Sequence, residues 1–323
     1  MPRSSSKDHV DPSFQSDLSV LIKIDLLKAM DSDISIISPV VVVCEMSLIF
    51  TDAGILGINR NLCREKMETI KQKLEDVDAL NNRTFLQTYF STDNKTSFVD
   101  ETLKFLIKSL HNILAAGNFK GQTAYDLSVG SIIHQLFALC EYYPEITILK
   151  LNEALITEVT KWMNSDTDAF NWGHACNFLK ELVGTGDQER KLKSSIKKIM
   201  TFGLPIDTLT DPVVLQPADC LVTAWLLDVT CQNQNEYIKK FQKLAKLLKP
   251  GGLLIYIGCL NATYYTIGQE RQCVFTYDES FLRKNLTNEG FKIETCEVLD
   301  SKIQSDLTDY KQFIVLTAVK KAA

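Results

Sequence analysis

Two carboxylates stand where ligand-binding side chains are expected in an α/β protein. Asp126 begins the turn Asp126-Leu127-Ser128-Val129-Gly130-Ser131, and Asp228 begins a polar loop after an apolar run. Ligands of doubly wound sheets bind at the carboxyl ends of strands, where a glycine-containing turn lets them approach backbone N–H groups. One glycine, Gly130, remains in this turn. Asp228 is either a ligand-binding residue or a cap or turn residue, since aspartate suits both positions.

His134 and Cys259 also carry side chains capable of chemistry. His134 is expected on a helix, either as a partly buried neutral residue or as a catalytic base. Cys259 either lines a pocket or is a reactive thiol, which would need an electropositive setting. No metal site is expected, because the four histidines are not closely spaced and the nine cysteines include no CxxC pair. The odd number of widely spaced cysteines favours free thiols in a reducing compartment.

Apolar runs alternate with helical patterns along most of the chain. We expect strands at Thr123–Leu127, Ile146–Leu151, Ala175–Leu179, Asp219–Trp225, Leu253–Gly258, Phe291–Val298 and Phe313–Val319. Helices are expected at 83–90, from a cap at Asp100 to Gly117, and near 131–141, 152–163, 187–201, 236–248 and 278–288. This alternation is typical of a parallel sheet with helices on both faces. No helical pattern separates the last two strands, so we expect them to form an antiparallel hairpin at one edge.

Composition and charge exclude several classes of partner. The net charge is −5, which gives no electrostatic reason to expect nucleic acid or an anionic membrane surface as a partner. The longest apolar run, Ile34–Phe50, is short for a membrane span and contains Pro39 and Glu45. We see no signal peptide, and we expect the protein to be cytoplasmic.

The N-terminal quarter of the chain differs from the rest. Residues 1–16 are polar and Ser-rich, which predicts a disordered tail. Residues 17–75 contain two apolar stretches and a helical pattern without functional chemistry, which favours an added packing element or a contact for self-association. The regular α/β pattern is assigned to a domain over 76–323.

Several short phrases carry a resemblance to a known family. The phrase Leu248-Lys249-Pro250-Gly251-Gly252 ends a helix, and its glycines allow the positive φ needed to turn into the next strand. The others are Ala169-Phe170-Asn171-Trp172, Pro217-Ala218-Asp219-Cys220, Leu227-Asp228 and Tyr264-Tyr265-Thr266-Ile267-Gly268. With them, the stretch from about Leu80 to the C-terminus resembles the nicotinamide, phenylethanolamine and indolethylamine N-methyltransferase family.

The resemblance implies a fold, a cofactor and a site. The fold is that of class I S-adenosylmethionine-dependent methyltransferases, a Rossmann-like seven-stranded sheet with an antiparallel edge hairpin and helices on both faces. The cofactor is S-adenosyl-L-methionine, and the substrate is a small amine or a pyridine-type molecule. The family's cofactor-binding positions fall on Tyr89, Phe90, Asp126, Ser128, Gly130, His134, Lys150, Gly203, Leu204 and Ala224. Its substrate-binding positions fall on Phe85, Asp228, Gly258, Cys259 and Ala262. Methyl transfer in this family depends on positioning and needs no catalytic acid–base pair.

Many of these positions lack the polar group of the family pattern. The family's ribose-binding Asp falls on Lys150, the Asp that holds adenine on Gly203, and the Asp that orients the substrate on Gly258. Its turn Asp-Ile-Gly-Ser-Gly-Pro has Ser128 for the first glycine and Ser131 for the proline, and two of its tyrosines fall on Phe85 and Phe90. A hydrogen bond to a charged group contributes about 1.5–3 kcal/mol, so we expect the loss of two carboxylates to weaken cofactor binding by roughly a thousandfold or more. The ammonium of Lys150 points either inward, toward the cofactor's sulfonium, or outward to solvent.

Two functions remain open at the level of the sequence. One is an active N-methyltransferase with a rearranged cofactor site. The other is a catalytically inactive pseudo-methyltransferase that serves as a binding or structural module and self-associates through residues 17–75. In a third possibility, the pocket, poorer in polar groups, holds a different hydrophobic ligand.

Overall fold

The computed structural model describes residues 50–51, 54–55, 81–92, 98–117, 119–184, 186–203 and 215–322. The expected tail (1–16), nearly all of the segment 17–75, and Leu204 lie outside these residues. The chain divides into two units, residues 1–67 and 68–323. In the first unit, strand β1 (Phe50–Thr51) pairs antiparallel with β2 (Gly54–Ile55). The other described elements belong to the second unit.

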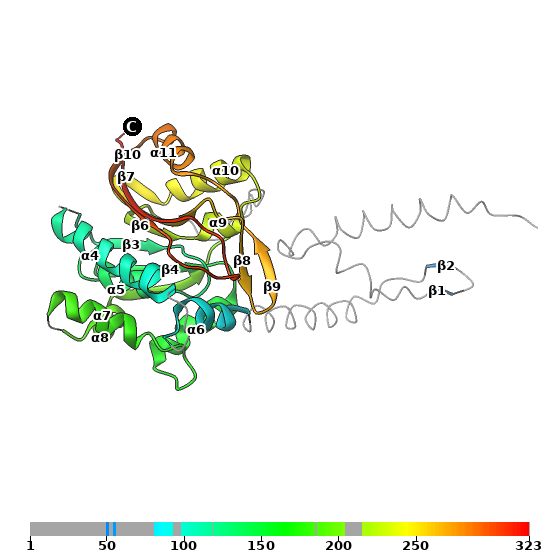
Figure 1. The fold of residues 1–323 in the computed structure, drawn as a ribbon, viewed down its shortest axis with the longest axis horizontal. Coiled ribbons are helices and arrows are strands. Elements are labelled where there is room, and N and C mark those ends of the chain that lie inside the picture. The colour runs from blue at the N-terminus through cyan, green and yellow to red at the C-terminus, as the bar shows by residue number, and fades with distance from the viewer. Residues whose placement is uncertain are drawn as a thin grey trace, which may run out of the picture. The chain divides into compact units, whose positions relative to one another are not determined.

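The second unit is built on a seven-stranded sheet (Figure 1). In spatial order its strands are β10 (Phe291–Asp300), β11 (Gln312–Lys320), β7 (Leu248–Leu260), β6 (Ala218–Ala224), β3 (Thr123–Asp126), β4 (Glu145–Lys150) and β5 (Ile196–Thr201). The five strands from β7 to β5 run parallel, and β11 runs antiparallel to both of its neighbours. The expected class I methyltransferase fold is therefore confirmed, including the antiparallel hairpin at one edge.

Helices cover both faces of this sheet (Figure 1). One face carries η1 (Val99–Phe105, a π-helix), α4 (Leu106–Ala116), α5 (His134–Leu139), α6 (Glu153–Asn164), α7 (Gly173–Val183) and α8 (Gln188–Ser195). The other carries α9 (Leu226–Thr230), α10 (Gln234–Ala245) and α11 (Glu279–Asn288). Successive strand residues point to opposite faces, so Cys220 and Val222 join the first core and Leu221 joins the second.

One expected strand is wrong, and a real strand takes the place of part of an expected helix. Residues Ala175–Leu179 lie inside α7, where Ala175 and Leu179 are buried four positions apart on one face. The edge strand β5 (Ile196–Thr201) lies in the stretch that we expected to be helical over 187–201. A short apolar run does not distinguish a strand from part of a helix. An edge strand tolerates charged residues, which obscured the strand pattern here.

Two helix boundaries also test the sequence patterns. Gly251 has φ +78° in the turn that leads from α10 into the central part of β7, as the Pro-Gly-Gly phrase predicts. Asp100 is not a helix cap, because η1 begins at Val99 and Asp100 lies in its first turn, paired with Lys104 at 2.6 Å.

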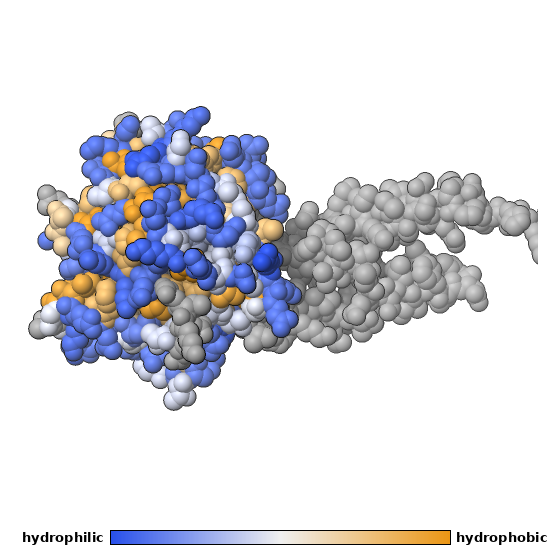
Figure 2. Space-filling view, viewed as in Figure 1, coloured by the Kyte–Doolittle hydropathy of each residue, from blue (hydrophilic) through white to orange (hydrophobic). Residues whose placement is uncertain are grey.

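The face of the second unit that Figure 2 shows is mainly polar. In the view of Figure 2, hydrophilic residues cover most of the described surface and hydrophobic residues lie in separate areas. Among the described residues, Val298 is the only exposed large hydrophobic side chain. None of the helices in the described part of the chain is both long and apolar enough to cross a membrane.

Candidate ligand-binding site

The two candidate carboxylates lie at the carboxyl ends of the neighbouring strands β3 and β6. Asp126 ends β3, and Asp228 lies in α9 just after β6. The turn after β3 continues beside β6, because the N–H of Val129 donates to the carbonyl of Ala224 (2.9 Å). Gly130 has φ +55°, a conformation that favours glycine. The strand order reverses between β3 and β6, which is where ligands bind in such sheets.

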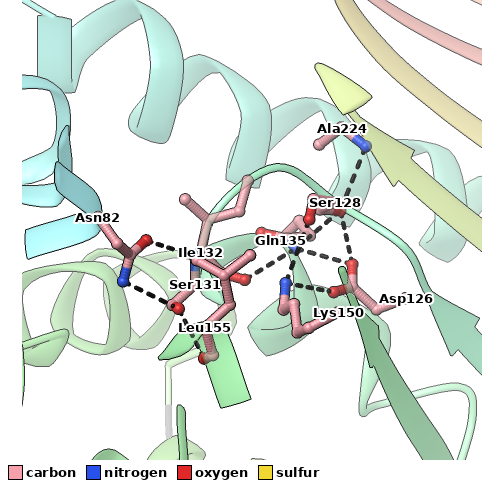
Figure 3. Close-up of polar contacts among 9 residues, drawn as sticks. All are labelled: Asn82, Asp126, Ser128, Ser131, Ile132, Gln135, Lys150, Leu155 and Ala224. Carbon is pink, nitrogen blue, oxygen red and sulfur yellow. Dashed lines mark hydrogen bonds and ion pairs between the residues drawn. The ribbon is translucent and has the colours of Figure 1, made fainter. Parts of the chain in front are cut away.

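Lys150 points into the protein at this edge. It ends β4, next to β3, and its side chain is fully buried. Its Nζ lies 3.4 Å from Oδ2 of Asp126 and donates to the carbonyl of Ser128 at 3.3 Å (Figure 3). Burial lowers the pKa of Lys150 from its ordinary value, while the neighbouring carboxylate opposes that change. Of the two orientations open from the sequence, the structure has the inward one.

The other oxygen of Asp126 is also occupied. Its Oδ1 accepts from Oγ of Ser128 at 2.7 Å and from Nε2 of Gln135 at 2.9 Å (Figure 3). The N–H of Ala224 in turn donates to Oγ of Ser128 at 3.2 Å. Asp126, Ser128, Gln135 and Lys150 therefore form a buried polar cluster whose members bond mainly to one another.

An aromatic group packs beside the buried polar cluster. The ring of Phe90 lies 4.9 Å from that of His134 and 6.1 Å from that of Trp225, and His134 stacks on Trp172 at 5.5 Å. His134 is fully buried, and its Nε2 donates to the carbonyl of Thr102 at 3.2 Å. Burial lowers the pKa of His134 to about 3, so the imidazole is neutral near pH 7 and packs as an aromatic ring.

A small cavity lies next to this group. It has a volume of about 70 Å³, and its walls come from helix 81–90, η1, the end of β6 and the hairpin β8 (Tyr264–Ile267)–β9 (Glu270–Cys273). Most of the lining side chains are aromatic or aliphatic, and they include Phe85, Phe90, Trp225, Tyr265 and Tyr310. We call this cavity the aromatic pocket.

Asp228 is the acidic side chain in the wall of the aromatic pocket. It is only 4% exposed, and its Oδ2 accepts from the N–H of Cys259 at 3.0 Å. Its Oδ1 accepts from the hydroxyls of Tyr277 (3.0 Å) and Tyr256 (3.3 Å). Burial raises the pKa of Asp228 to about 6, although these hydrogen bonds favour the ionised form. The ion pairs found among the described residues do not include Asp228.

The surroundings of Gly258 leave little room for the aspartate that the family pattern has at this position. A Cβ on Gly258 would lie 2.3 Å from the hydroxyl of Tyr277, so this tyrosine occupies the space that an aspartate side chain would need.

The indole Nε1 of Trp225 donates to Sγ of Cys259 at 3.2 Å, and burial raises the pKa of this thiol well above its ordinary value. Cys259 is therefore a protonated wall residue of the aromatic pocket. Trp225 itself has φ +53°, a costly conformation for a residue other than glycine.

The remaining expected site residues divide into two groups. Tyr89, Phe85 and Ala262 line the aromatic pocket. Gly203 lies beyond β5, where its carbonyl accepts from Nζ of Lys243 at 2.7 Å, and it joins neither the buried polar cluster nor the aromatic pocket. Among the described residues, no group of three or more His, Cys, Asp or Glu side chains could hold a metal ion.

Three residues of the site were not found from the sequence. Gln135 and His134 are the two polar residues in the otherwise apolar stretch from Ile132 to Leu139, a signal that could have pointed to a buried polar role. Tyr277 and Asn82 lie in stretches without a motif, and only the fold places them beside Asp228 and Ser131.

Known proteins similar to this chain are small-molecule N-methyltransferases. The profile of the NNMT/PNMT/TEMT family matches residues 68–321. Nicotinamide N-methyltransferase of Homo sapiens is 27% identical over 244 residues, which cover 74% of this chain and 92% of that protein. Indolethylamine N-methyltransferase of Oryctolagus cuniculus is 30% identical over 216 residues, or 66% of this chain and 82% of that protein. Phenylethanolamine N-methyltransferase of Homo sapiens is 28% identical over 218 residues, or 64% and 76%.

A solved structure gives a weaker likeness. Magnesium protoporphyrin IX methyltransferase from Synechocystis with bound SAH aligns with a TM-score of 0.48 and 15% identity, covering 74% of this chain and 94% of that one.

Proposed function

This chain belongs to the NNMT/PNMT/TEMT family, and from that premise we propose that it is a pseudo-methyltransferase. In this proposal it does not transfer methyl groups, and its aromatic pocket binds a small amine or pyridine-type cation. The family depends on S-adenosylmethionine, so the proposal rests on how the residues of this chain suit that cofactor.

The inward ammonium of Lys150 is the observation that carries the proposal. It stands at the family's ribose-binding position, where the cofactor's hydroxyls need an acceptor, and an ammonium has three donors and no acceptor. Its charge is paired with that of Asp126 at 3.4 Å, so this edge offers the cofactor's sulfonium no net negative charge. The carboxylate of Asp126 also accepts from Ser128 and Gln135, so its described bonds are made within the protein. These residues do not fit S-adenosylmethionine.

The aromatic pocket supports the second half of the proposal. Cations bind favourably over aromatic faces, and the wall of this pocket adds a buried carboxylate, Asp228, without a cationic partner among the described residues. Its volume is about half that of a cavity known to hold one benzene molecule, so a ring-sized ligand needs a small movement of the lining side chains. The similar proteins are named for nicotinamide, an uncharged pyridine, and for indolethylamine and phenylethanolamine, which are small amines that carry a positive charge near pH 7.

The second candidate function is methylation of such an amine with a rearranged cofactor site. The observation that favours it is the position of Asp228 in the pocket wall, together with the retained Asp126, Gly130 and Tyr89.

Isothermal titration of the full chain with S-adenosylmethionine and S-adenosylhomocysteine tests the proposal. We expect no binding heat at about 1 mM ligand, because two charged hydrogen-bond partners are missing. S-adenosylhomocysteine lacks the sulfonium charge, so a difference between the two ligands would measure what that charge contributes to binding at this site. We also expect no labelled product when radiolabelled S-adenosylmethionine is supplied with nicotinamide, phenylethanolamine or indolethylamine. A dissociation constant below about 100 μM, or a labelled amine, would contradict the proposal and favour the second candidate.

A further inference from the structure

Helix 81–90 is joined to the turn after β3 by a reciprocal pair of hydrogen bonds. Nδ2 of Asn82 donates to Oγ of Ser131 at 3.0 Å, and the backbone N–H of Ser131 donates to Oδ1 of Asn82 at 3.1 Å (Figure 3). Oγ of Ser131 donates in turn to the carbonyl of Leu155 at 2.7 Å. Asn82 and Ser131 are 6% and 1% exposed, so water competes little for these bonds.

The pair depends on a residue that breaks the family pattern. The resemblance of this turn to the family pattern places a proline at the position of Ser131. Proline has neither a backbone N–H nor a hydroxyl, so it could make neither bond to Asn82. The two elements are also in close contact, because a Cβ on Gly130 would lie 3.0 Å from Oδ1 of Asn82 and 3.2 Å from the ring of Phe85.

The same helix carries three side chains of the aromatic pocket. Phe85, Tyr89 and Phe90 project from helix 81–90 into its wall, and the ring of Phe85 lies 5.3 Å from that of Tyr89 and 5.7 Å from that of Phe90. A second attachment holds the same helix to α6, where Nη2 of Arg83 lies 2.8 Å from the carboxylate of Glu158. The position of the pocket wall therefore depends on how the helix is attached to the sheet.

We infer that Asn82 and Ser131 are positioning residues that hold helix 81–90 closed over the aromatic pocket without any bound ligand. They act through Phe85 and Phe90, which they place in the pocket wall. The inference rests on the proposed function in one respect, namely that the aromatic pocket binds a ligand. If the pocket wall is already in place before the ligand arrives, binding costs less conformational entropy. The attachment itself stands independently of any ligand.

Hydrogen–deuterium exchange of the full chain, without ligand, tests the inference. In the unchanged protein we expect helix 81–90 to be protected. Ser131→Pro removes both bonds to Asn82, and exchange in this helix should become about tenfold faster or more. Ser131→Ala keeps the backbone N–H, so its effect should be smaller. Asn81→Ala changes an exposed residue of the same helix and serves as the matched control, with exchange unchanged.

A local effect separates positioning from a merely structural role. The amides of β6 and β7 should keep their protection in every variant, because a general loss of stability would accelerate them as well. If Ser131→Pro does not fold, Asn82→Ala removes the same two bonds without changing the turn. Equal exchange of helix 81–90 in the unchanged protein and in these variants would overturn the inference. So would acceleration that is uniform across the domain. Because no ligand takes part, a failure here leaves the proposed function standing, and the cofactor titration leaves this inference standing.

Discussion

At the scale of the residue, the buried acids of the site differ in what neutralises them. The carboxylate of Asp126 has the ammonium of Lys150 at 3.4 Å, whereas Asp228 has only hydroxyl and N–H donors within hydrogen-bond distance. Burial raises the pKa of Asp228 to about 6, above its ordinary value of 3.8. The folded protein therefore holds this proton over a pH range in which the unfolded chain releases it. By itself, Asp228 stabilises the fold at low pH and loses that contribution as the pH rises through this range.

A cation in the aromatic pocket should show the opposite dependence on pH. N-methylpyridinium has a permanent positive charge, so it favours the ionised form of Asp228 and should bind about tenfold more tightly at pH 7 than at pH 5. Titration followed by tryptophan fluorescence would measure this, because Trp225 lines the pocket.

Two controls accompany that measurement. Toluene has a similar shape without charge, and its affinity should not change between the two pH values. Asp228→Asn should remove the pH dependence for N-methylpyridinium. Equal affinity of the cation at both pH values would show that Asp228 does not act as its counterion.

At the scale of the element, Tyr89 joins helix 81–90 to the far side of the aromatic pocket. Its buried hydroxyl accepts from the N–H of Thr266 in β8 (3.0 Å) and lies at donating distance from the carbonyls of Thr266 and Leu307, both at 3.0 Å. Burial raises the pKa of Tyr89 to about 12, so the hydroxyl stays protonated. One side chain thus holds three segments together.

Tyr89→Phe should loosen that junction. The change leaves a buried N–H and two carbonyls without this partner, and we expect the free energy of unfolding to fall by about 1–3 kcal/mol. Chemical denaturation measures the loss, and limited proteolysis should detect a more accessible hairpin β8–β9. Tyr264→Phe, a change in the same hairpin, should cost less than half as much. Equal losses in both variants would contradict the role assigned to the hydroxyl of Tyr89.

Sequence patterns predicted most elements of the sheet but not all of them. Strands such as β6, with apolar residues on both faces, stood out because both faces are buried. The edge strand β5 did not, because Lys197 and Lys198 are exposed there. Its parallel pairing with β4 is a long-range contact, and no local pattern encodes it.

Sequence patterns predicted which residues lie at the site better than they predicted the hydrogen bonds and ion pairs that these residues make. The carboxylate of Asp126 and the positive φ of Gly130 follow from the turn after β3. The direction of Lys150 does not, because a lysine stem can extend to solvent or to a buried partner with equal local geometry. The partner Asn82 becomes evident only in the fold, which brings helix 81–90 to the turn after β3 from 49 residues away in the sequence.

At the scale of the whole molecule, the methyltransferase-like unit is expected to fold without the N-terminal residues. The family profile begins at residue 68, and the division between the two units falls at the same place. We expect deletion of residues 1–67 to change the melting temperature by less than about 2 °C, a shift well below that of losing one buried contact.

The same deletion tests whether residues 17–75 serve as a contact for self-association, one of the two roles that the sequence leaves open. If the segment mediates self-association, light scattering should give the full chain a mass greater than that of one chain. The shortened chain should have the mass of a single copy. A monomeric full chain would contradict self-association, and a large fall in melting temperature would contradict an independent second unit.

The ion pair between Lys150 and Asp126 also bears on which changes at position 150 the domain tolerates. Lys150→Asp would place two carboxylates side by side in the interior, and removal of one partner from a buried pair costs about 3–5 kcal/mol. Most domains have only about 5–15 kcal/mol of stability to lose. Single substitutions at position 150 are therefore expected to be removed by selection for a folded protein, which makes this lysine epistatically bound to Asp126.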